Sequence, residues 1–261
     1  MQAYTYQNIP TSRIATFDVF AIGLQKHHVI ALLEFDVTES RKKLQALKKQ
    51  GIKVSFTAWL VKVIGTALAQ HPEAAAYLYN KRKLLIFQDI NISLLVEKKL
   101  GDKKVPIPLV IEKANEKSVT EIAQIIEAAK NQPLSDSDIV LKKRTKTYER
   151  LYYHLPGFLR RMIWRLLLRY PKIAYRNMGN AVITSVGMMG KLNGWFVQRS
   201  VHPVSFGIGG IIPKPIVIND EITIREILNA TILLDHDVID GAPMVRFVND
   251  LNQMLEKATG L

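Results

Sequence analysis

A short polar stretch near the C-terminus, residues 235–241, separates a β-rich segment from a helical one and so limits how the chain can fold. Residues 229–234 before it read as a strand. After it, apolar side chains recur at helical spacing, at Met244, Phe247, Val248, Leu251 and Leu255. His236 therefore lies where a strand becomes a helix, and such corners expose side chains.

His236 and Asp240 carry the candidate chemistry of this corner. An imidazole with an unperturbed pKa of about 6.5 can take a proton from a thiol of pKa about 8.5 when it is held neutral and aimed at the sulfur. The thiolate then becomes the nucleophile. Asp240 precedes Gly241, where it could fix the turn by pairing with a distant cation or cap the helix that follows.

Composition favours one domain over residues 1–261, because 48% hydrophobic content is enough for a full core. The chain has no cysteine, which excludes a thiol nucleophile, a thiolate metal site and disulfides, and fits a reducing compartment. Residues 1–10 lack the apolar core of a signal peptide, and no uncharged run reaches the ~18 residues of a spanning helix. We expect a cytoplasmic domain without a bound metal.

The net charge of +13 is concentrated in one region. Between residues 142 and 176 there are eleven Lys or Arg against one acid, Glu149, so this segment supplies +10 of the total. A local charge of this kind does not indicate a general nucleic-acid-binding surface, and we expect no nucleic-acid partner.

Within this basic segment, the residues from Phe158 to Tyr170 read as a helix that Pro171 ends. Arg161, Arg165 and Arg169 share one face, and the opposite face carries Leu159, Ile163, Leu166 and Tyr170. Three interpretations remain open: peripheral attachment to an anionic membrane surface, docking onto an acidic partner or the phosphates of coenzyme A, and packing on the body with a solvated basic face.

The chain as a whole resembles the catalytic domain of the dihydrolipoyl acyltransferases, the E2 components of 2-oxoacid dehydrogenase complexes. That family reads D-H-R-x-x-D-G where this chain reads D-H-D-V-I-D-G, with Asp237 in place of the Arg. Residues 90–96 and 180–190 also match family strands, and the resemblance covers residues 11–256 except for an insertion at about 142–176. Carnitine acyltransferases and peptide-synthetase condensation domains share H-x-x-x-D-G, but they carry two such lobes and this chain has the length of one.

The resemblance implies an α/β chloramphenicol acetyltransferase-like fold, a mixed sheet flanked by helices. It places Thr184 at the family's functional Ser, whose hydroxyl donates a hydrogen bond to the oxyanion of the tetrahedral intermediate. Ser185 is the alternative donor, and because strand side chains alternate, one of the two can face the site. Arg13 is the candidate cation for Asp240, with a solvated helix charge as its other interpretation.

The function implied is acyl transfer between coenzyme A and an acceptor, perhaps a thiol such as dihydrolipoamide, with His236 as general base. In this fold the base and the oxyanion donor come from neighbouring subunits, which implies a homotrimer or a cage built from trimers. The sequence shows no lipoyl or subunit-binding domain, so a free-standing acyltransferase with another acceptor stays open. The competing hypothesis is a non-catalytic trimeric scaffold attached through its basic helix. Coenzyme A-binding residues, acyl group, acceptor and cage size are not specified by the sequence.

Overall fold

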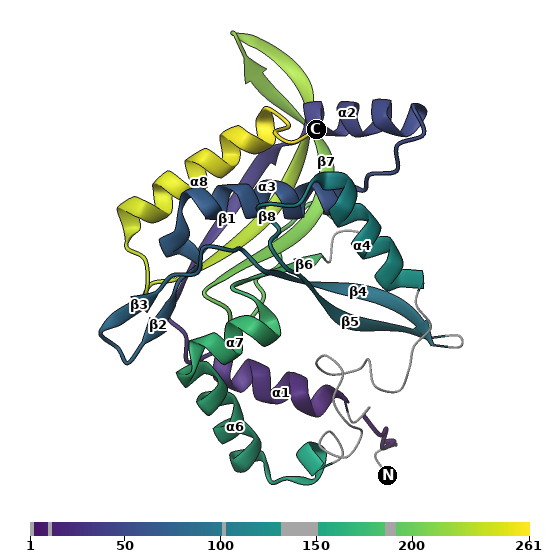
Figure 1. Cartoon of the computed structure of the whole chain (residues 1–261). Coiled ribbons are helices and arrows are strands. Elements are labelled where there is room, and N and C mark those ends of the chain that lie inside the picture. The colour runs from purple at the N-terminus through teal and green to yellow at the C-terminus, as the bar shows by residue number, and fades with distance from the viewer. Residues whose placement is uncertain (1–2, 10–11, 101–102, 132–150, 186–191) are drawn as a thin grey trace.

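The computed structural model describes residues 3–9, 12–100, 103–131, 151–185 and 192–261, and its centre is a six-stranded mixed sheet (Figure 1). The strand order is β1-β8-β7-β6-β4-β5, and β6 runs parallel to β4 and to β7 while the other neighbours are antiparallel. The strands are β1 (His28–Asp36), β4 (Ile92–Leu100), β5 (Lys103–Ile111), β6 (Ala181–Ser185), β7 (Val204–Ile218) and β8 (Glu221–Asp235). A separate hairpin pairs β2 (Tyr77–Tyr79) with β3 (Lys83–Leu85).

Helices cover one face of this sheet and gather at one of its ends (Figure 1). The covering helices are α2 (Thr38–Lys49), α3 (Phe56–Gln70), α4 (Val119–Asn131) and α8 (Gly241–Glu256), with the 3-10 turn η1 (Pro72–Ala75) after α3. The helices at the end are α1 (Ser12–Gly23), α6 (Gly157–Arg169) and α7 (Pro171–Met178). In the described ranges, no helix has both the length and the apolarity to cross a bilayer.

The main core lies between the sheet and the covering helices. On β8, alternate side chains point into it: Leu228, Ala230, Ile232 and Leu234. Helix α3 is apolar nearly all round, which is the pattern of a buried helix, and Trp59 is its largest fully buried side chain. The predicted mixed α/β architecture is therefore confirmed.

The other face of the central strands is covered by an irregular segment, residues 192–199. Residues 192–199 pass so close to β7 that a Cβ on Gly210 would lie 2.5 Å from the Leu192 carbonyl oxygen. The Trp195 indole N–H donates to the Leu33 carbonyl at 2.9 Å and ties this segment to β1. The glycines of β7 are therefore needed for close approach of another backbone.

In the sequence, residues 202–210 read as a central strand, residues 216–228 as a hairpin with a turn at Asn219 and Asp220, and residues 98–104 as a polar turn. In the structure, the central strand continues into the outgoing arm of the hairpin as one strand, β7, with an irregularity between Ile208 and Ile211. The predicted turn at Asn219 and Asp220 is confirmed, and both residues have positive φ, as a two-residue hairpin turn requires. The polar turn expected at 98–104 is shorter, because strand continues to Leu100 and resumes at Lys103.

The sequence predicts side-chain caps at two helix starts, a capping box at Ser118 and Glu121 and an N-cap at Thr38, and the structure shows one of the two. The capping box at Ser118 and Glu121 is confirmed, since the Glu121 backbone N–H donates to Ser118 Oγ at 3.2 Å and the Ser118 N–H to Glu121 Oε2 at 2.7 Å. Thr38, expected as an N-cap, is instead the first residue of α2 after Val37. Its hydroxyl is used in another way, because it donates to Asp36 Oδ1 at 2.6 Å.

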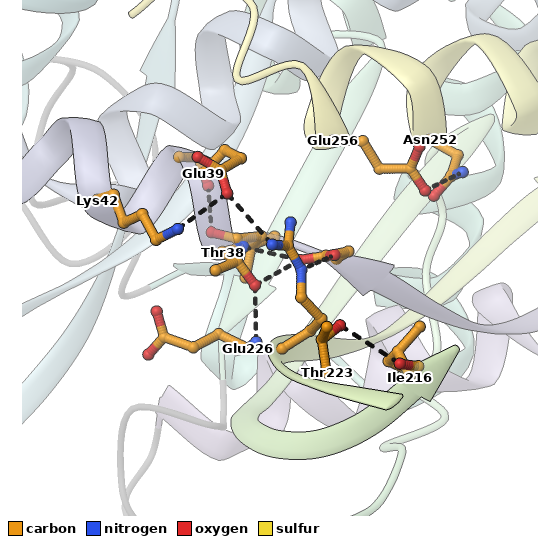
Figure 2. Close-up of polar contacts among 12 residues, drawn as sticks. Thr38, Glu39, Lys42, Ile216, Thr223, Glu226, Asn252 and Glu256 are labelled. Atoms are coloured by element: carbon orange, nitrogen blue, oxygen red, sulfur yellow. Dashed lines mark hydrogen bonds and ion pairs between the residues drawn. The ribbon is translucent and has the colours of Figure 1, made fainter. Parts of the chain in front are cut away.

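A polar cluster fixes α2 against the outer part of β8 (Figure 2). Arg225 donates to Asp36 Oδ2 at 2.6 Å and to Glu39 Oε1 at 3.3 Å, and the Glu226 N–H donates to Thr38 Oγ1 at 2.8 Å. Burial acts to raise the pKa of Asp36, but its hydrogen bonds from Thr38 and Arg225 outweigh burial and lower that pKa. This cluster holds the base of the projecting β7–β8 hairpin.

The predicted basic helix exists as α6, but it does not pack on the face that the sequence indicated. Trp164, Leu167 and Leu168 face a small cluster with Ile22 of α1, and Arg160 Nε donates to the buried Asp18 at 2.6 Å. Of the four apolar residues predicted on one face, Ile163, Leu166 and Tyr170 are 43% to 54% exposed, and Leu159 is half-buried. The expectation failed because α6 carries apolar side chains on both sides. The N-terminal part of the insertion, residues 142–150, lies outside the described residues.

Candidate active site

His236 follows the last residue of β8, at the predicted corner between strand and helix. Its backbone N–H donates to the His27 carbonyl at 2.9 Å, so this position is held against the residue that precedes β1. The side chain is half exposed, and its Nδ1 lies 4.0 Å from Asp240 Oδ1, within range of an electrostatic interaction and too far for a hydrogen bond. An exposed imidazole with one nitrogen near a carboxylate leaves its Nε2 free to meet a substrate.

Asp240 occupies the N-cap position of α8 but does not cap it through its side chain. The carboxylate is 90% exposed, so the capping interpretation of this residue is wrong. Arg13 lies in the first turn of α1 with an exposed side chain, and within the described ranges no ion pair joins it to Asp240. The pairing of Arg13 with Asp240 stays a prediction that a single copy of the chain does not realise.

Asp235, just before His236, is fully buried and forms an ion pair with Lys26, whose Nζ lies 2.5 Å from Oδ2. Asp235 Oδ1 also accepts the Asp237 backbone N–H at 3.3 Å. These contacts fix the residues on both sides of His236. The sequence indicated no role for Lys26 or Asp235 beyond two weak signals: a Lys two residues before a strand and an Asp after three aliphatic residues.

Asp237, which stands where the family has Arg, does not contact the candidate base. Its Oδ1 lies 2.9 Å from His27 Nδ1. This hydrogen bond raises the pKa of His27, and the negative charge of Asp237 acts in the same direction. Asp237 is next to His236 in the sequence, but its carboxylate is thus bonded to His27, a second exposed imidazole.

Two more histidines support this end of the sheet. His202 reads in the sequence as a simple loop histidine, but it is buried: its Nε2 lies 3.0 Å from the Met178 carbonyl oxygen and its Nδ1 3.2 Å from Ser200 Oγ. Burial lowers the pKa of His202 to about 4. His28 Nε2 donates to the His202 carbonyl at 3.0 Å, and burial lowers the pKa of His28 as well. Both rings are structural groups held neutral.

Thr184 and Ser185 end strand β6 and point to opposite faces of the sheet. Ile183 lies in the main core, so Ser185 follows the core-facing side, whereas Thr184 is half-buried on the other face. Ser185 is exposed because the strand ends there. The structure separates the two candidates, and the residues from 186 to 191 that follow them lie outside its description.

Thr184 and His236 do not meet within one chain. Thr184 pairs with Gly207 of β7, whereas the backbone N–H of Asp235, the residue before His236, donates to the carbonyl of Pro203, just before β7 and four residues before Gly207. Four strand residues span about 13 Å, and β6 and β8 lie two strand spacings, about 10 Å, apart, so the two backbones are separated by on the order of 15 Å. The two side chains could act on one reacting group only if they came from different copies.

The described residues contain no group of three or more His, Cys, Asp or Glu placed to hold a metal ion. The side chains of His236 and Thr184 offer proton transfer and hydrogen bonding as candidate chemistry. No described contact assigns residues to coenzyme A binding.

The mixed sheet and the histidine after β8 define the class of coenzyme A-dependent acyltransferase folds. The structure is similar to that of chloramphenicol acetyltransferase, with a TM-score of 0.52 at 12% identity, covering 97% of this chain and 99% of that one. It is also similar to the cubic core of a pyruvate dehydrogenase multienzyme complex, with a TM-score of 0.66 at 18% identity and coverage of 97% and 92%. At these identities, the likeness shows the fold.

The chain belongs to the family described as 2-oxoacid dehydrogenases acyltransferase (catalytic domain), whose model matches residues 10–140 and 172–261. Among curated relatives, the dihydrolipoyllysine-residue acetyltransferase component of the Bacillus subtilis pyruvate dehydrogenase complex is 28% identical over 237 residues, 87% of this chain and 44% of that protein. The chain spans between 28% and 52% of the length of such relatives. Residues 141–171, which include most of the predicted insertion, fall outside the family match.

One solved relative bears on the site. A crystallographic study of dihydrolipoamide acetyltransferase from Azotobacter vinelandii concerns the role of one serine, one histidine and one asparagine in its catalytic mechanism. That structure has a TM-score of 0.67 to this one at 17% identity, covering 97% of this chain and 92% of the other.

Proposed function

We propose that this domain transfers an acyl group between coenzyme A and a thiol acceptor such as dihydrolipoamide. The observation that carries the proposal is His236, half exposed at the end of β8, with Asp240 beside its Nδ1 and its backbone held by the His27 carbonyl. An acceptor thiol needs a neutral, accessible base at this position. Membership of the acyltransferase family supports the same reaction class.

Residue spacing supports the three catalytic assignments. In the Azotobacter protein the serine precedes the histidine by 52 residues, and the asparagine follows the histidine by four. Thr184, His236 and Asp240 repeat both intervals. Ser185 would be one residue out of step, and its side chain follows the core-facing side of β6. We therefore assign the oxyanion donor to Thr184.

In the proposed reaction, Nε2 of His236 removes the proton from the acceptor thiol. The resulting thiolate sulfur attacks the carbonyl carbon of acyl-coenzyme A, and the carbonyl oxygen becomes an oxyanion that the Thr184 hydroxyl stabilises by donating a hydrogen bond. When the tetrahedral intermediate collapses, the bond from carbon to the coenzyme A sulfur breaks. His236 returns its proton to that sulfur, so no covalent acyl-enzyme forms.

We further propose that the site is completed by a second copy, in a homotrimer or a cage built from trimers. The separation of Thr184 from His236 within one chain calls for such an arrangement. Apolar side chains are exposed on the edge strand β1, at Ile30 and Leu32, and on the projecting hairpin, at Ile222 and Ile224. Exposed apolar residues in these places are typical of contacts between subunits. The cubic core formed by a structural relative is consistent with this assembly.

Turnover measurements test the reaction. His236→Ala should lower kcat for acyl transfer from acetyl-coenzyme A to dihydrolipoamide by about 10²- to 10⁴-fold, the usual contribution of a general base. The matched control is His27→Ala, which removes another exposed imidazole at the same end of the sheet and should retain most of the activity. Equal activity in the His236 variant and the native protein would refute the assignment.

Light scattering tests the assembly. We expect native protein to have the mass of three chains or a multiple of three, and Ile222→Lys with Ile224→Lys to reduce that mass. Val245→Lys, an equally simple change at an exposed site on α8, is the control. A catalytically active monomer would contradict the proposed shared site.

A non-catalytic scaffold is the second candidate, favoured by one observation: within the described ranges, no Lys or Arg pairs with Asp240 to hold the turn, and the His236 ring is 4.0 Å away. In that case His236 would be a surface group of a structural turn. The His236→Ala comparison separates the two, since a scaffold predicts background turnover from both proteins.

For the domain itself, we propose a single unit over residues 1–261 into which the basic segment at about 142–176 is inserted.

A further inference from the structure

Helix α6 presents an apolar face to the outside of the molecule. Its packed side carries Trp164, Leu167 and Leu168. At 3.6 residues per turn, Met162 and Leu166 lie on the side opposite Trp164. The outward face continues onto α7, and its apolar side chains are between 42% and 64% exposed: Phe158, Met162, Ile163, Leu166, Tyr170 and Ile173.

The same surface is cationic. Residues 157–178 contain five Arg and one Lys and no acidic residue. Arg160 is used internally by Asp18. The other five are Arg161, Arg165, Arg169, Lys172 and Arg176, and within the described part of the chain none of them forms an ion pair with an acid. Their charge is therefore available to a partner.

The proposed acyltransferase does not account for this surface. The family match passes over residues 141–171, which contain all of α6. Asp18 is buried in α1, and besides Arg160 its Oδ2 accepts the hydroxyl of Tyr152 at 2.9 Å, so the helix is held by specific polar contacts. A firmly anchored helix that exposes apolar side chains between arginines indicates an interaction surface.

We propose that α6 and α7 dock the protein peripherally on an anionic lipid bilayer. Lipid phosphates match the planar forks of the arginines, and the acyl region receives the apolar side chains between them. A two-fold contact with a second copy of the chain fits less well, because it would place the same cations opposite one another. This inference does not depend on the acyl-transfer reaction.

Vesicle sedimentation tests the proposal. The full chain should bind vesicles of phosphatidylglycerol mixed with phosphatidylcholine, and should not bind phosphatidylcholine alone. Arg165→Gln with Arg169→Gln should weaken binding about fivefold for each arginine, the usual contribution of a basic residue at an anionic surface. Met162→Ser with Leu166→Ser should weaken it at least about tenfold through lost apolar burial.

Matched controls come from exposed sites elsewhere. Lys43→Gln with Lys48→Gln removes the same charge from α2, and Leu84→Ser with Val245→Ser removes exposed apolar groups from β3 and α8; each pair should change binding less than about twofold. Far-UV circular dichroism checks that every variant is folded. Absence of vesicle binding, or equal losses in test and control pairs, would overturn the proposal. So would a fall in oligomer mass of the Met162 and Leu166 variant without lipid, which would assign α6 to a contact between copies.

Discussion

Lys26 forms an ion pair with Asp235 across 209 residues of sequence, and this pair fixes the strand end that carries His236. Lys26 lies just before β1, and the antiparallel register that pairs His28 with Asp235 brings the two together. Because Asp235 is fully buried, its carboxylate needs charge compensation, and within the described ranges Lys26 supplies it. The position of His236 therefore depends on how the segment around Lys26 packs against the end of β8.

Lys26→Met should destabilise the protein by about 3–5 kcal/mol, because it leaves a buried charge without its partner. Adding Asp235→Asn should restore part of this loss, since the buried charge is then removed. Urea unfolding of both single variants and the double variant measures the coupling. Lys42→Met breaks the exposed pair with Glu39 and should cost less than about 1 kcal/mol. Equal losses in the Lys26 and Lys42 variants would contradict the argument.

Strand identity was predictable here, but strand partners were not. The Asn219 and Asp220 turn and the apolar runs around it indicated the hairpin between β7 and β8 from local sequence. The pairing of β1 with β8 joins segments about 200 residues apart, and no local pattern specifies that register. Lys26 could therefore not be connected to Asp235 from the sequence.

The prediction of which face of α6 packs against the protein was wrong for a different reason. Periodicity locates an apolar face when the opposite face is polar, whereas α6 has apolar side chains all round and arginines on two sides. The decisive group is Asp18, a buried acid on α1 that selects Arg160 and so sets the rotation of the helix. A buried charge partner is a tertiary feature that helical spacing does not reveal.

Thr184→Ala should lower kcat by about 10²- to 10³-fold, because one oxyanion donor is removed. Thr184→Ser keeps the hydroxyl and should retain activity within about tenfold, and Ser185→Ala should have little effect. Steady-state kinetics with acetyl-coenzyme A measure all three, and KM should change less than kcat since the hydrogen bond forms in the transition state. A larger loss in the Ser185 variant would move the oxyanion donor by one residue.

Mixed assemblies test whether Thr184 and His236 act across a subunit boundary. His236→Ala and Thr184→Ala are each expected to be nearly inactive. Co-expressed in equal amounts and assembled at random, they should recover about one quarter of native turnover, because one site in four then combines a native His from one copy with a native Thr from the next. A site contained within one chain would recover nothing. Turnover of the mixture, compared with that of each variant alone, decides between the two arrangements.

His202 should make the protein less stable as the pH falls. Burial lowers its pKa from 6.5 to about 4, so the unfolded chain binds a proton over this interval and the folded chain does not. The stabilisation is fully present above pH 6.5 and is lost as the pH falls toward 4, at up to about 1.4 kcal/mol per pH unit. His28, whose pKa is also lowered by burial, acts in the same direction.

Urea unfolding from neutral pH down to about 4 measures this loss. His202→Gln removes the buried ring and cannot bind the proton. Its free energy of unfolding should therefore be lower than that of the native protein at neutral pH, and it should fall less steeply on acidification. His236→Gln, a change at an exposed imidazole, should follow the native slope. A His202 variant that kept the native slope between pH 6.5 and 4 would contradict this prediction. The acid sensitivity would then arise from other groups and not from the buried His202 ring that is bonded to Met178.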